Sequence, residues 1–356
     1  MSIKGPLAGK NILVTGGTGS LGKTLIRRLL SYEMGEPETI TVFSRDEGKL
    51  HQMMVNYQTS NDEALKEKFF AKVKFRIGDV RDVASLMPAV MQSQVIINTA
   101  ALKQVPSCEY FPAEAVKTNI LGAMNIVGCI SDHNTSVETV VCISTDKAAK
   151  PVNVMGMTKA VQERVFPQGS FLCPKTRFVA VRYGNVLASR GSVIPLFHEL
   201  INAGKDLTIT DARMTRFLLS LDDSVNLIFG AINSGKTGDL YIPKVPAARM
   251  TDLAEVLIGE RDIKWVETEI RPGEKLHEIL ISEDEGRRAF VRDGFYVIPS
   301  SLPEIVGDNT PDAEPLNMEY SSSTDIMSKD QLHALLEKNG LLLESVDYKN
   351  DDELIR

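Results

Sequence analysis

The sequence has few cysteines and no long apolar run. Its four cysteines (Cys108, Cys129, Cys142 and Cys173) are scattered without CxxC spacing, which argues against a zinc site and a disulfide framework. The first apolar run, Ile12–Val14, leads directly into glycines, so neither a signal peptide nor a membrane span is expected. These absences favour a cytoplasmic protein with reduced thiols, no metal and no membrane partner.

Basic residues are also in the minority. The 356 residues include 40 Lys and Arg against 47 Asp and Glu, for a formal net charge of -7. This balance disfavours nucleic acid and anionic membranes as general partners, so any phosphate site has to be local. Hydrophobic residues make up 43% of the chain, enough for the core of one large domain or two closely packed domains.

A glycine-rich turn follows the first predicted strand. Residues 11–14 are followed by TGGTGSLG (residues 15–22) and then by the helix KTLIRRLL. This glycine spacing permits a tight turn, a close approach of backbone to a pyrophosphate and close helix packing. Strand, turn and helix in this order predict a dinucleotide site that includes Gly16, Thr18, Gly19, Ser20, Leu21 and Gly22.

Strands and helices then alternate along the chain. Further strands are predicted at TITVFSRD, KVKFRIGDV, VIINTAA and residues 140–143, with helical segments between them. The alternation predicts an α/β fold, a Rossmann-type doubly wound parallel sheet with helices on both faces. We expect a dinucleotide-binding domain over residues 8–183, a smaller substrate-binding region over 184–300 interleaved with the Rossmann core, and a C-terminal arm with a short helix over 301–356.

The ends of the predicted strands supply further cofactor candidates. The second strand ends at Ser44, Arg45 and Asp46, where the adenosine ribose should lie. An acid there would bind the 2'-hydroxyl of NAD, whereas Arg45 suits the 2'-phosphate of NADP. We predict NADP, with NAD as second choice; Arg45 and Asp46 can also cap the next helix. Later strand ends and a helix over about 114–132 add Asp79, Val80, Ala100, Ala101, Lys103 and Asn119.

The strand at 140–143 ends in STDK (residues 144–147), two hydroxyls followed by an acid and a base. Ligands of doubly wound folds bind at this edge of the sheet. A helix expected to begin near Met155 would place Met155 and Lys159 on one face. A solvated Asp146–Lys147 ion pair is the alternative to a catalytic site. The predicted catalytic residues are Thr145, Asp146, Lys147, Lys159 and Met155.

Several segments together resemble a known family. TGGTGSLG, STDK, RYGNVLASRGSVIPLF, MTRF and RPGEKLHE resemble the extended short-chain dehydrogenase/reductase superfamily, and within it the UDP-N-acetylglucosamine 4,6-dehydratases of polysaccharide and nonulosonic acid biosynthesis. The resemblance covers about residues 10–282. One position departs from it: the superfamily's YxxxK is Met155-Gly156-Met157-Thr158-Lys159 here, so the expected tyrosine is absent, as in some members of the dehydratase group.

The resemblance implies a reaction that begins with hydride transfer from C4 of the sugar to bound NADP. Water then leaves across C5 and C6, and hydride returns to C6. Lys147 and Asp146 supply the base for C5 and the acid for O6, and Lys159 holds the nicotinamide ribose. Because methionine has no proton to exchange, the base for O4 stays open among Thr145, a water molecule and Asp146.

A UDP-sugar substrate is implied as well. Arginine can bind diphosphate oxygens in a bidentate manner, and Glu274 can accept hydrogen bonds from ribose or uracil. Arg190 and Arg213 could equally form surface ion pairs, and Lys103 could be a plain surface lysine. The substrate candidates are Lys103, Asn185, Arg190, Val193, Thr208, Arg213, Arg216, Arg271 and Glu274.

The stereochemistry at C5 is predicted to be inverting, because SRDE, DARMTRF and IRPGEKLHE are similar to inverting members, although methionine at 155 also occurs among retaining ones. Successive strand residues point to opposite sides, so Asp146 and Lys147 are expected to flank the sugar ring. The alternatives are a retaining dehydratase, a C4 epimerase of the same superfamily and a non-catalytic dinucleotide-binding protein. We expect a homo-oligomer. VRDGFYVIPS is predicted as an edge strand, and the arm after it could cover the active site, contact a neighbouring subunit or be loosely attached.

Overall fold

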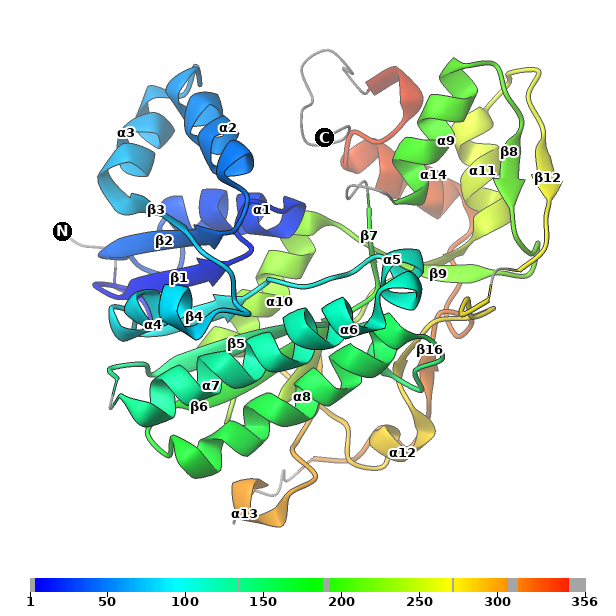
Figure 1. Ribbon diagram of the computed structural model, residues 1–356. Coiled ribbons are helices and arrows are strands. Elements are labelled where there is room, and N and C mark those ends of the chain that lie inside the picture. The colour runs from blue at the N-terminus through cyan, green and yellow to red at the C-terminus, as the bar shows by residue number, and fades with distance from the viewer. Residues whose placement is uncertain (1–3, 134, 188–191, 271, 307–312, 346–356) are drawn as a thin grey trace.

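The computed structural model describes residues 4–133, 135–187, 192–270, 272–306 and 313–345. Nine strands form the central sheet: β1 (Asn11–Thr15), β2 (Thr39–Ser44), β3 (Val73–Ile77), β4 (Val95–Asn98), β5 (Thr139–Thr145), β6 (Arg177–Tyr183), β10 (Leu240–Ile242), β14 (Phe290–Arg292) and β15 (Phe295–Ile298). Their order is β14-β15-β10-β6-β5-β4-β1-β2-β3 (Figure 1). The run from β3 to β10 is parallel, and β15 and β14 are antiparallel. The predicted doubly wound α/β fold is confirmed.

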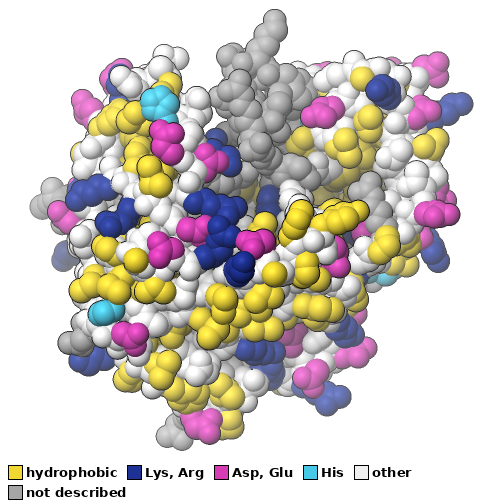
Figure 2. Space-filling model, in the orientation of Figure 1, with side chains coloured by type: hydrophobic (Ala, Val, Ile, Leu, Met, Phe, Trp, Pro, Cys, Tyr) yellow, Lys and Arg dark blue, Asp and Glu magenta, His cyan; other side chains and the backbone are white. Residues whose placement is uncertain are grey.

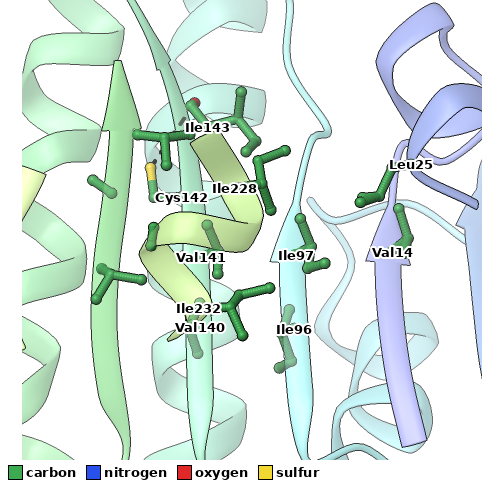
Figure 3. Packing of buried hydrophobic residues seen from close by; sticks show 14 of the residues in the cluster. Val14, Leu25, Ile96, Ile97, Val140, Val141, Cys142, Ile143, Ile228 and Ile232 are labelled. Atoms are coloured by element: carbon green, nitrogen blue, oxygen red, sulfur yellow. Dashed lines mark hydrogen bonds between the residues drawn. The ribbon is translucent and has the colours of Figure 1, made fainter. Parts of the chain in front are cut away.

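Helices cover both faces of this sheet. On one face α4 (Val83–Met91), α7 (Gly122–Asp132) and α8 (Val154–Leu172) pack against one another, and on the other α1 (Ser20–Leu30) packs against α10 (Leu221–Ser234). In Figure 3, Ile228 and Ile232 of α10 lie over Val140 and Val141 of β5. The central strands are buried on both sides, which explains why their sequences are almost continuously apolar.

The segment predicted as one helix over 114–132 is divided. It consists of α6 (Pro112–Ala115), a π-helical turn (Val116–Leu121) and α7, and it is preceded by α5 (Val105–Tyr110). Asn119 lies buried in the π turn, where its side chain bonds the backbone N–H and C=O of Leu102 and the hydroxyl of Thr158. The π turn thus ties the loop after β4 to helix α8.

Acidic N-caps begin the helices that follow β2 and β3. Asp46 caps α2 (Glu47–Gln58) and Asp62 caps α3 (Glu63–Lys72), each by accepting from a backbone N–H of the first turn. Asp82 caps α4 in the same way. Such caps satisfy donors that have no partner inside the helix. The capping alternative for Asp46 is therefore present in the structure.

A second apolar core lies beside the sheet (Figure 1, upper right). Its elements are α9 (Val193–Asn202), β8 (Leu207–Ile209), β9 (Thr215–Leu219), β11 (Ala247–Arg249), α11 (Met250–Ile258), β12 (Trp265–Glu267) and α14 (Lys329–Lys338). Strand β9 pairs with β11 on one side and with β7 (Asn185–Val186) on the other. The predicted region 184–300 also contributes β10, β14 and β15 to the central sheet, so the two regions share one sheet. The domain boundaries themselves stay a prediction.

The segment VRDGFYVIPS differs from expectation. It is not one edge strand, because β15 pairs with both β10 and β14 and only β14 forms the edge. Asp293 and Gly294, with φ of 48° and 84°, make the turn between the two strands. Asp-Gly between two apolar segments is a strong hairpin signal. The prediction of a single strand did not take this signal into account.

The described part of the C-terminal arm packs on its own chain. Strand β16 (Tyr320–Ser321) pairs with β13 (Ile279–Ile281), and α14 packs against α11. The short helices α12 (Glu283–Gly286) and α13 (Pro303–Val306) lie along the path to the arm. Residues 313–345 are therefore not a loose tail. Across the described ranges, no helix combines the length and apolar character needed to cross a bilayer.

Candidate functional site

The glycine-rich turn joins β1 to α1. Gly16 has φ of 67°, and a Cβ there would lie 2.8 Å from the backbone of Ala100 at the end of β4. The hydroxyl of Thr18 lies 3.0 Å from that of Ser44. The N-cap of α1, Gly19, provides no side-chain hydrogen bond to the helix. A helix N-terminus without a side-chain cap fits the pyrophosphate of a dinucleotide, and Ser20, Leu21 and Gly22 are its first three residues.

The ends of β2 and β3 meet beside this turn. The side chain of Arg45 is 58% exposed, with its guanidinium 3.9 Å from the carboxylate of Asp79. Asp79 also forms an ion pair with Arg81 at 2.6 Å. Burial opposes ionisation of Asp79, but Arg81 and then Arg45 outweigh it and lower the pKa of this carboxyl group. Lys and Arg side chains gather near the middle of the face shown in Figure 2. Arg45 is thus an exposed cation next to the dinucleotide turn.

The remaining cofactor candidates differ in exposure. Ala101 and Lys103 are exposed in the loop after β4, and Ala100 is half-buried. Val80 is buried, and its side chain lies where a Cβ on Gly122 would meet it. All the polar groups of the Asn119 side chain already have partners within the chain, so its observed contribution is to position Leu102 and Thr158. Contact of these residues with a cofactor stays a prediction.

Asp146 and Lys147 follow β5 in a short 3-10 turn. Asp146 is fully buried, and its Oδ1 accepts from the hydroxyl of Thr145 at 2.8 Å and from Lys147 Nζ at 3.1 Å. The expectation that the two side chains point to opposite sides is wrong, because a 3-10 turn does not alternate sides as a strand does. They form the alternative ion pair, but its acid is buried and the Lys147 side chain is only 22% exposed. Asp146 Oδ2 has no hydrogen-bond partner among the described residues.

Glu278 is the functional candidate that the sequence prediction missed. It is 2% exposed, and its Oε1 lies 3.4 Å from Lys147 Nζ and 3.7 Å from Arg216 Nε. Lys275 donates to the carbonyl of Ala149 at 2.5 Å. Asp146, Lys147, Glu278, Arg216 and Lys275 thus form one group, here called the Lys147 cluster. The motif RPGEKLHE predicts this segment through Arg271 and Glu274, whereas the structure brings its last residue, Glu278, to Lys147.

Met155 and Lys159 are both buried on α8, 4% and 5% exposed. Met155 packs with Cys108 and Ala115 in a small apolar cluster. Lys159 donates to the side-chain oxygen of Gln162, and burial lowers the pKa of its ammonium group. Lys159 therefore has no carboxylate hydrogen-bond partner among the described residues, unlike Lys147.

Arg216 is buried, and its guanidinium donates to the carbonyls of Thr215 and Leu276. Arg213 is 74% exposed and pairs with Asp211 at 2.7 Å, the surface ion pair considered from the sequence. Thr208 is exposed on β8, which pairs with β12 in the outer part of the smaller region.

The other substrate candidates lie in three separate segments or outside the described residues. Asn185 begins β7, and its Oδ1 is buried without a partner in the described chain. Val193 is the first residue of α9. Glu274 is half-buried in the loop before β13. Arg190 and Arg271 lie outside the described residues. Within those residues no group of three His, Cys, Asp or Glu side chains could hold a metal ion.

The chain is similar in sequence and structure to known nucleotide-sugar enzymes. The chain is 40% identical over 303 residues to the inverting UDP-N-acetylglucosamine 4,6-dehydratase of Campylobacter jejuni, covering 84% of this chain and 86% of the relative. It is 41% identical over 297 residues to the UDP-glucose 4-epimerase of Rickettsia akari, covering 82% and 83%. The X-ray structure of Pen from Bacillus thuringiensis matches with a TM-score of 0.83 and 33% identity, over 94% of this chain and 99% of that one.

The predicted family resemblance is confirmed by these relatives and by a family model. That model, described as polysaccharide biosynthesis protein, matches residues 12–300. The matched range includes the glycine turn, the STDK turn and Glu278. On this evidence, the chain belongs to the polysaccharide biosynthesis protein family, among the dehydratases and epimerases of the extended short-chain dehydrogenase/reductase superfamily.

Proposed function

We propose that the chain is a nucleotide-sugar 4,6-dehydratase, a lyase that acts on UDP-N-acetylglucosamine and inverts C5. The observation that carries this proposal is the ion pair at the carboxyl end of β5 between the buried Asp146 and Lys147, whose side chain is 22% exposed. Elimination of water needs an acid and a base on neighbouring atoms, and this pair offers both. The relatives named as inverting dehydratases support the substrate and the stereochemistry.

A nicotinamide dinucleotide, when bound, would supply the hydride acceptor and donor at C4 and C6. The glycine turn at Gly16, with its positive φ and its close approach to Ala100, fits the pyrophosphate. Lys159, buried near the start of α8, would hold the nicotinamide ribose. Lys147 would exchange the C5 proton and Asp146 would protonate O6. Thr145, which donates to Asp146 at 2.8 Å, could pass the O4 proton to that carboxylate.

One incubation tests the main proposal. The protein with its dinucleotide and UDP-N-acetylglucosamine should give a product lighter by one water, detected by mass spectrometry. In deuterium oxide, NMR couplings should show a solvent deuteron at C5 in the inverted configuration. A product with retained C5 configuration would overturn the proposal of inversion, and a product of unchanged mass would overturn the proposal of dehydration.

Epimerisation at C4 is the second candidate, because relatives at 41% identity carry that name. It would give a product of unchanged mass, and it needs no acid–base pair for elimination. Lys147→Ala and Asp146→Asn separate the two functions. Under the dehydratase proposal both variants bind the sugar nucleotide in calorimetry but release no water; weaker binding with normal turnover at saturation would mark the pair as binding residues.

NADP is proposed as the cofactor in preference to NAD because Arg45 is an exposed cation beside the dinucleotide turn. Loss of a charge-assisted phosphate contact should weaken NADP binding by about 1.5–3 kcal/mol and leave NAD binding unchanged. The matched control is Arg249→Ala, since the Arg249 side chain is 57% exposed and lies 3.9 Å from Asp252. If Arg45→Ala binds both dinucleotides as the wild type does, the assignment is wrong.

A homo-oligomer is proposed from the apolar surface over α7 and α8. Apolar side chains spread over these helices in Figure 2. The side chains of Leu121 in the π turn, Met124 in α7, and Met157 and Val161 in α8 are each between 43% and 51% exposed. A group of exposed apolar side chains, unlike single scattered ones, marks an interaction surface. A second copy of the chain would cover them. Light scattering should show a particle larger than one chain, and Met124→Glu together with Val161→Glu should reduce it to a monomer.

A further inference from the structure

Lys147 lies between two buried carboxylates. Its Nζ is 3.1 Å from Asp146 Oδ1 and 3.4 Å from Glu278 Oε1, and these two acidic side chains are 0% and 3% exposed. The second oxygen of each acid, Asp146 Oδ2 and Glu278 Oε2, is buried without a hydrogen-bond partner in the described chain. Both carboxylates therefore retain an acceptor position for a proton or a ligand.

The charges around Lys147 come from three elements. Asp146 is its neighbour in the turn after β5, Glu278 precedes β13, and Arg216 of β9 lies 3.7 Å from Glu278. Lys275 adds a second cation that interacts with both acids and with Lys147. Burial disfavours the charged form of Lys147, but Asp146 and Glu278 outweigh it and raise the pKa of this ammonium group. Lys147 is therefore protonated before the reaction begins.

A protonated lysine cannot remove the C5 proton, so its own proton must first leave. Asp146 is not a free acceptor for it, because it has to carry a proton to O6. Solvent is a poorer acceptor because the Lys147 side chain is only 22% exposed and both carboxylates are buried. Glu278 is the remaining carboxylate within reach of Nζ. The 3.4 Å separation needs to shorten by only roughly a few tenths of an ångström, as ligand-free catalytic contacts commonly do.

We propose that Glu278 is the proton acceptor that converts Lys147 from ammonium to amine, and so acts through Lys147 as a positioning residue for removal of the C5 proton. The inference rests on the proposed dehydratase function. Nζ–H breaks and Glu278 Oε1–H forms; the amine lone pair of Lys147 then takes the C5 proton while O6 leaves with the proton of Asp146.

The proton count closes over one cycle. Before reaction the three groups hold one proton, on Lys147. Oxidation at C4 releases the O4 proton, which Thr145 passes to Asp146, so they hold two. Elimination adds the C5 proton and releases one proton in water, and return of one proton to C5 restores the first state. No acid or base outside Asp146, Lys147 and Glu278 is needed to balance the protons.

Glu278 is held firmly enough for this role. Its backbone N–H donates to the hydroxyl of Ser322 at 3.0 Å, and its carbonyl accepts from the N–H of Ser322 at 2.8 Å. Arg216 Nε lies 3.7 Å from Oε1, the same oxygen that faces Lys147. A proton acceptor needs such a fixed position, because the rate of proton transfer falls steeply as the donor and acceptor move apart or out of line.

Glu278→Gln tests the inference because it keeps the shape of the side chain and removes its capacity to take a proton. The measurements are kcat for water loss as a function of pH and sugar-nucleotide binding by calorimetry. At neutral pH we expect kcat to fall by about 100-fold while binding stays within about twofold. For Glu278→Gln, log kcat should rise by about one unit per pH unit, because hydroxide and solvent then deprotonate Lys147 in place of Glu278. The matched control is Glu283→Gln, whose side chain is 76% exposed and which should behave as the wild type.

The pH profile separates this role from a purely structural one. A Glu278→Gln profile parallel to that of the wild type, or an undiminished kcat, overturns the inference while leaving the dehydratase proposal standing; a wild-type protein that releases no water overturns both. If circular dichroism shows that Glu278→Gln does not fold, Glu278→Asp replaces it. The shorter acid should lower kcat and keep the wild-type pH profile, and a steeper profile for Glu278→Asp would contradict the proposal.

Discussion

Arg182 and Glu163 form a bidentate ion pair behind the Lys147 cluster. Arg182 Nη2 lies 2.6 Å from Glu163 Oε2, and Arg182 Nε lies 3.0 Å from Glu163 Oε1. The same guanidinium binds Glu285 at 2.9 Å, and Glu163 accepts from the hydroxyl of Ser144 at 2.5 Å. Burial opposes the charge of Arg182, but the two glutamates outweigh it and raise the pKa of the guanidinium. This pair joins β5, β6 and α8 next to the turn that carries Asp146.

Removing the cation should destabilise the fold strongly. Arg182→Met would leave two buried carboxylates without their partner, and breaking a buried pair in this way costs about 3–5 kcal/mol. Urea denaturation should show this loss. Arg27→Met, on a side chain that is 51% exposed, is the control and should change the free energy of unfolding by less than about 1 kcal/mol. A comparable, small effect for Arg182→Met would contradict the prediction.

The lowered pKa of Glu285 predicts how the free energy of unfolding depends on pH. Burial alone would raise its pKa, but Arg182 and Ser282 lower it to about 2 from 4.5. Because the folded value is depressed, the stabilisation is complete above pH 4.5 and is lost as the pH falls toward about 2. It amounts to about 3 kcal/mol. The free energy of unfolding, measured across this range, should fall less steeply for Glu285→Gln than for the wild type; equal slopes would show that other groups govern the acid limb.

Gly156 sets the distance between α8 and the turn that carries Lys147. A Cβ at Gly156 would lie 2.2 Å from the backbone oxygen of Lys147, whereas one at Gly128 of α7 meets nothing within 4 Å. Gly156→Ala should therefore displace the 146–148 turn and reduce turnover at least roughly tenfold. Gly128→Ala should leave turnover unchanged and stabilise the helix by up to about 1 kcal/mol. Equal kcat values for the two variants would refute the packing argument.

Restoring a tyrosine at position 155 should not increase the rate. Met155 is buried against Cys108 and Ala115, so a larger ring overpacks this cluster and should cost about 1–3 kcal/mol of stability. Thermal unfolding and kcat of Met155→Tyr test this, with Met157→Tyr as the control on a half-exposed side chain of the same helix. A rise in kcat would instead mean that the phenol reaches the sugar.

The sequence was sufficient for the fold because the relevant patterns are local. Apolar strands that end in polar residues, and a glycine turn before a helix, predict a parallel sheet with its ligand edge. The side chains of Asp146 and Lys147 were expected on opposite sides because the strand pattern was continued into the turn. The alternation of side chains between the two faces of a sheet ends where the backbone enters a 3-10 turn, and this transition leaves no clear mark in STDKA.

Glu278 could not be found in the same way. Its importance depends on a contact with Lys147, 131 positions earlier in the chain, and local periodicity says nothing about such pairs. RPGEKLHE contains two glutamates, and only the bend that starts β13 decides which of them turns toward Lys147. The burial of Met155 is likewise decided by residues of two other helices, Cys108 of α5 and Ala115 of α6. Distant contacts of this kind limited the prediction of the site more than that of the fold.

The hydroxyl of Ser322 connects two segments that are synthesised before it. It accepts from the N–H of Glu278 and donates to the carbonyl of Thr215, so a late residue completes the surroundings of a much earlier one. During synthesis the chain emerges from the ribosome with its N-terminus first, so Glu278 stays without this support until the segment around Ser322 has left the exit tunnel. The surroundings of Glu278 are therefore completed late in synthesis, after both Thr215 and Glu278 have been made.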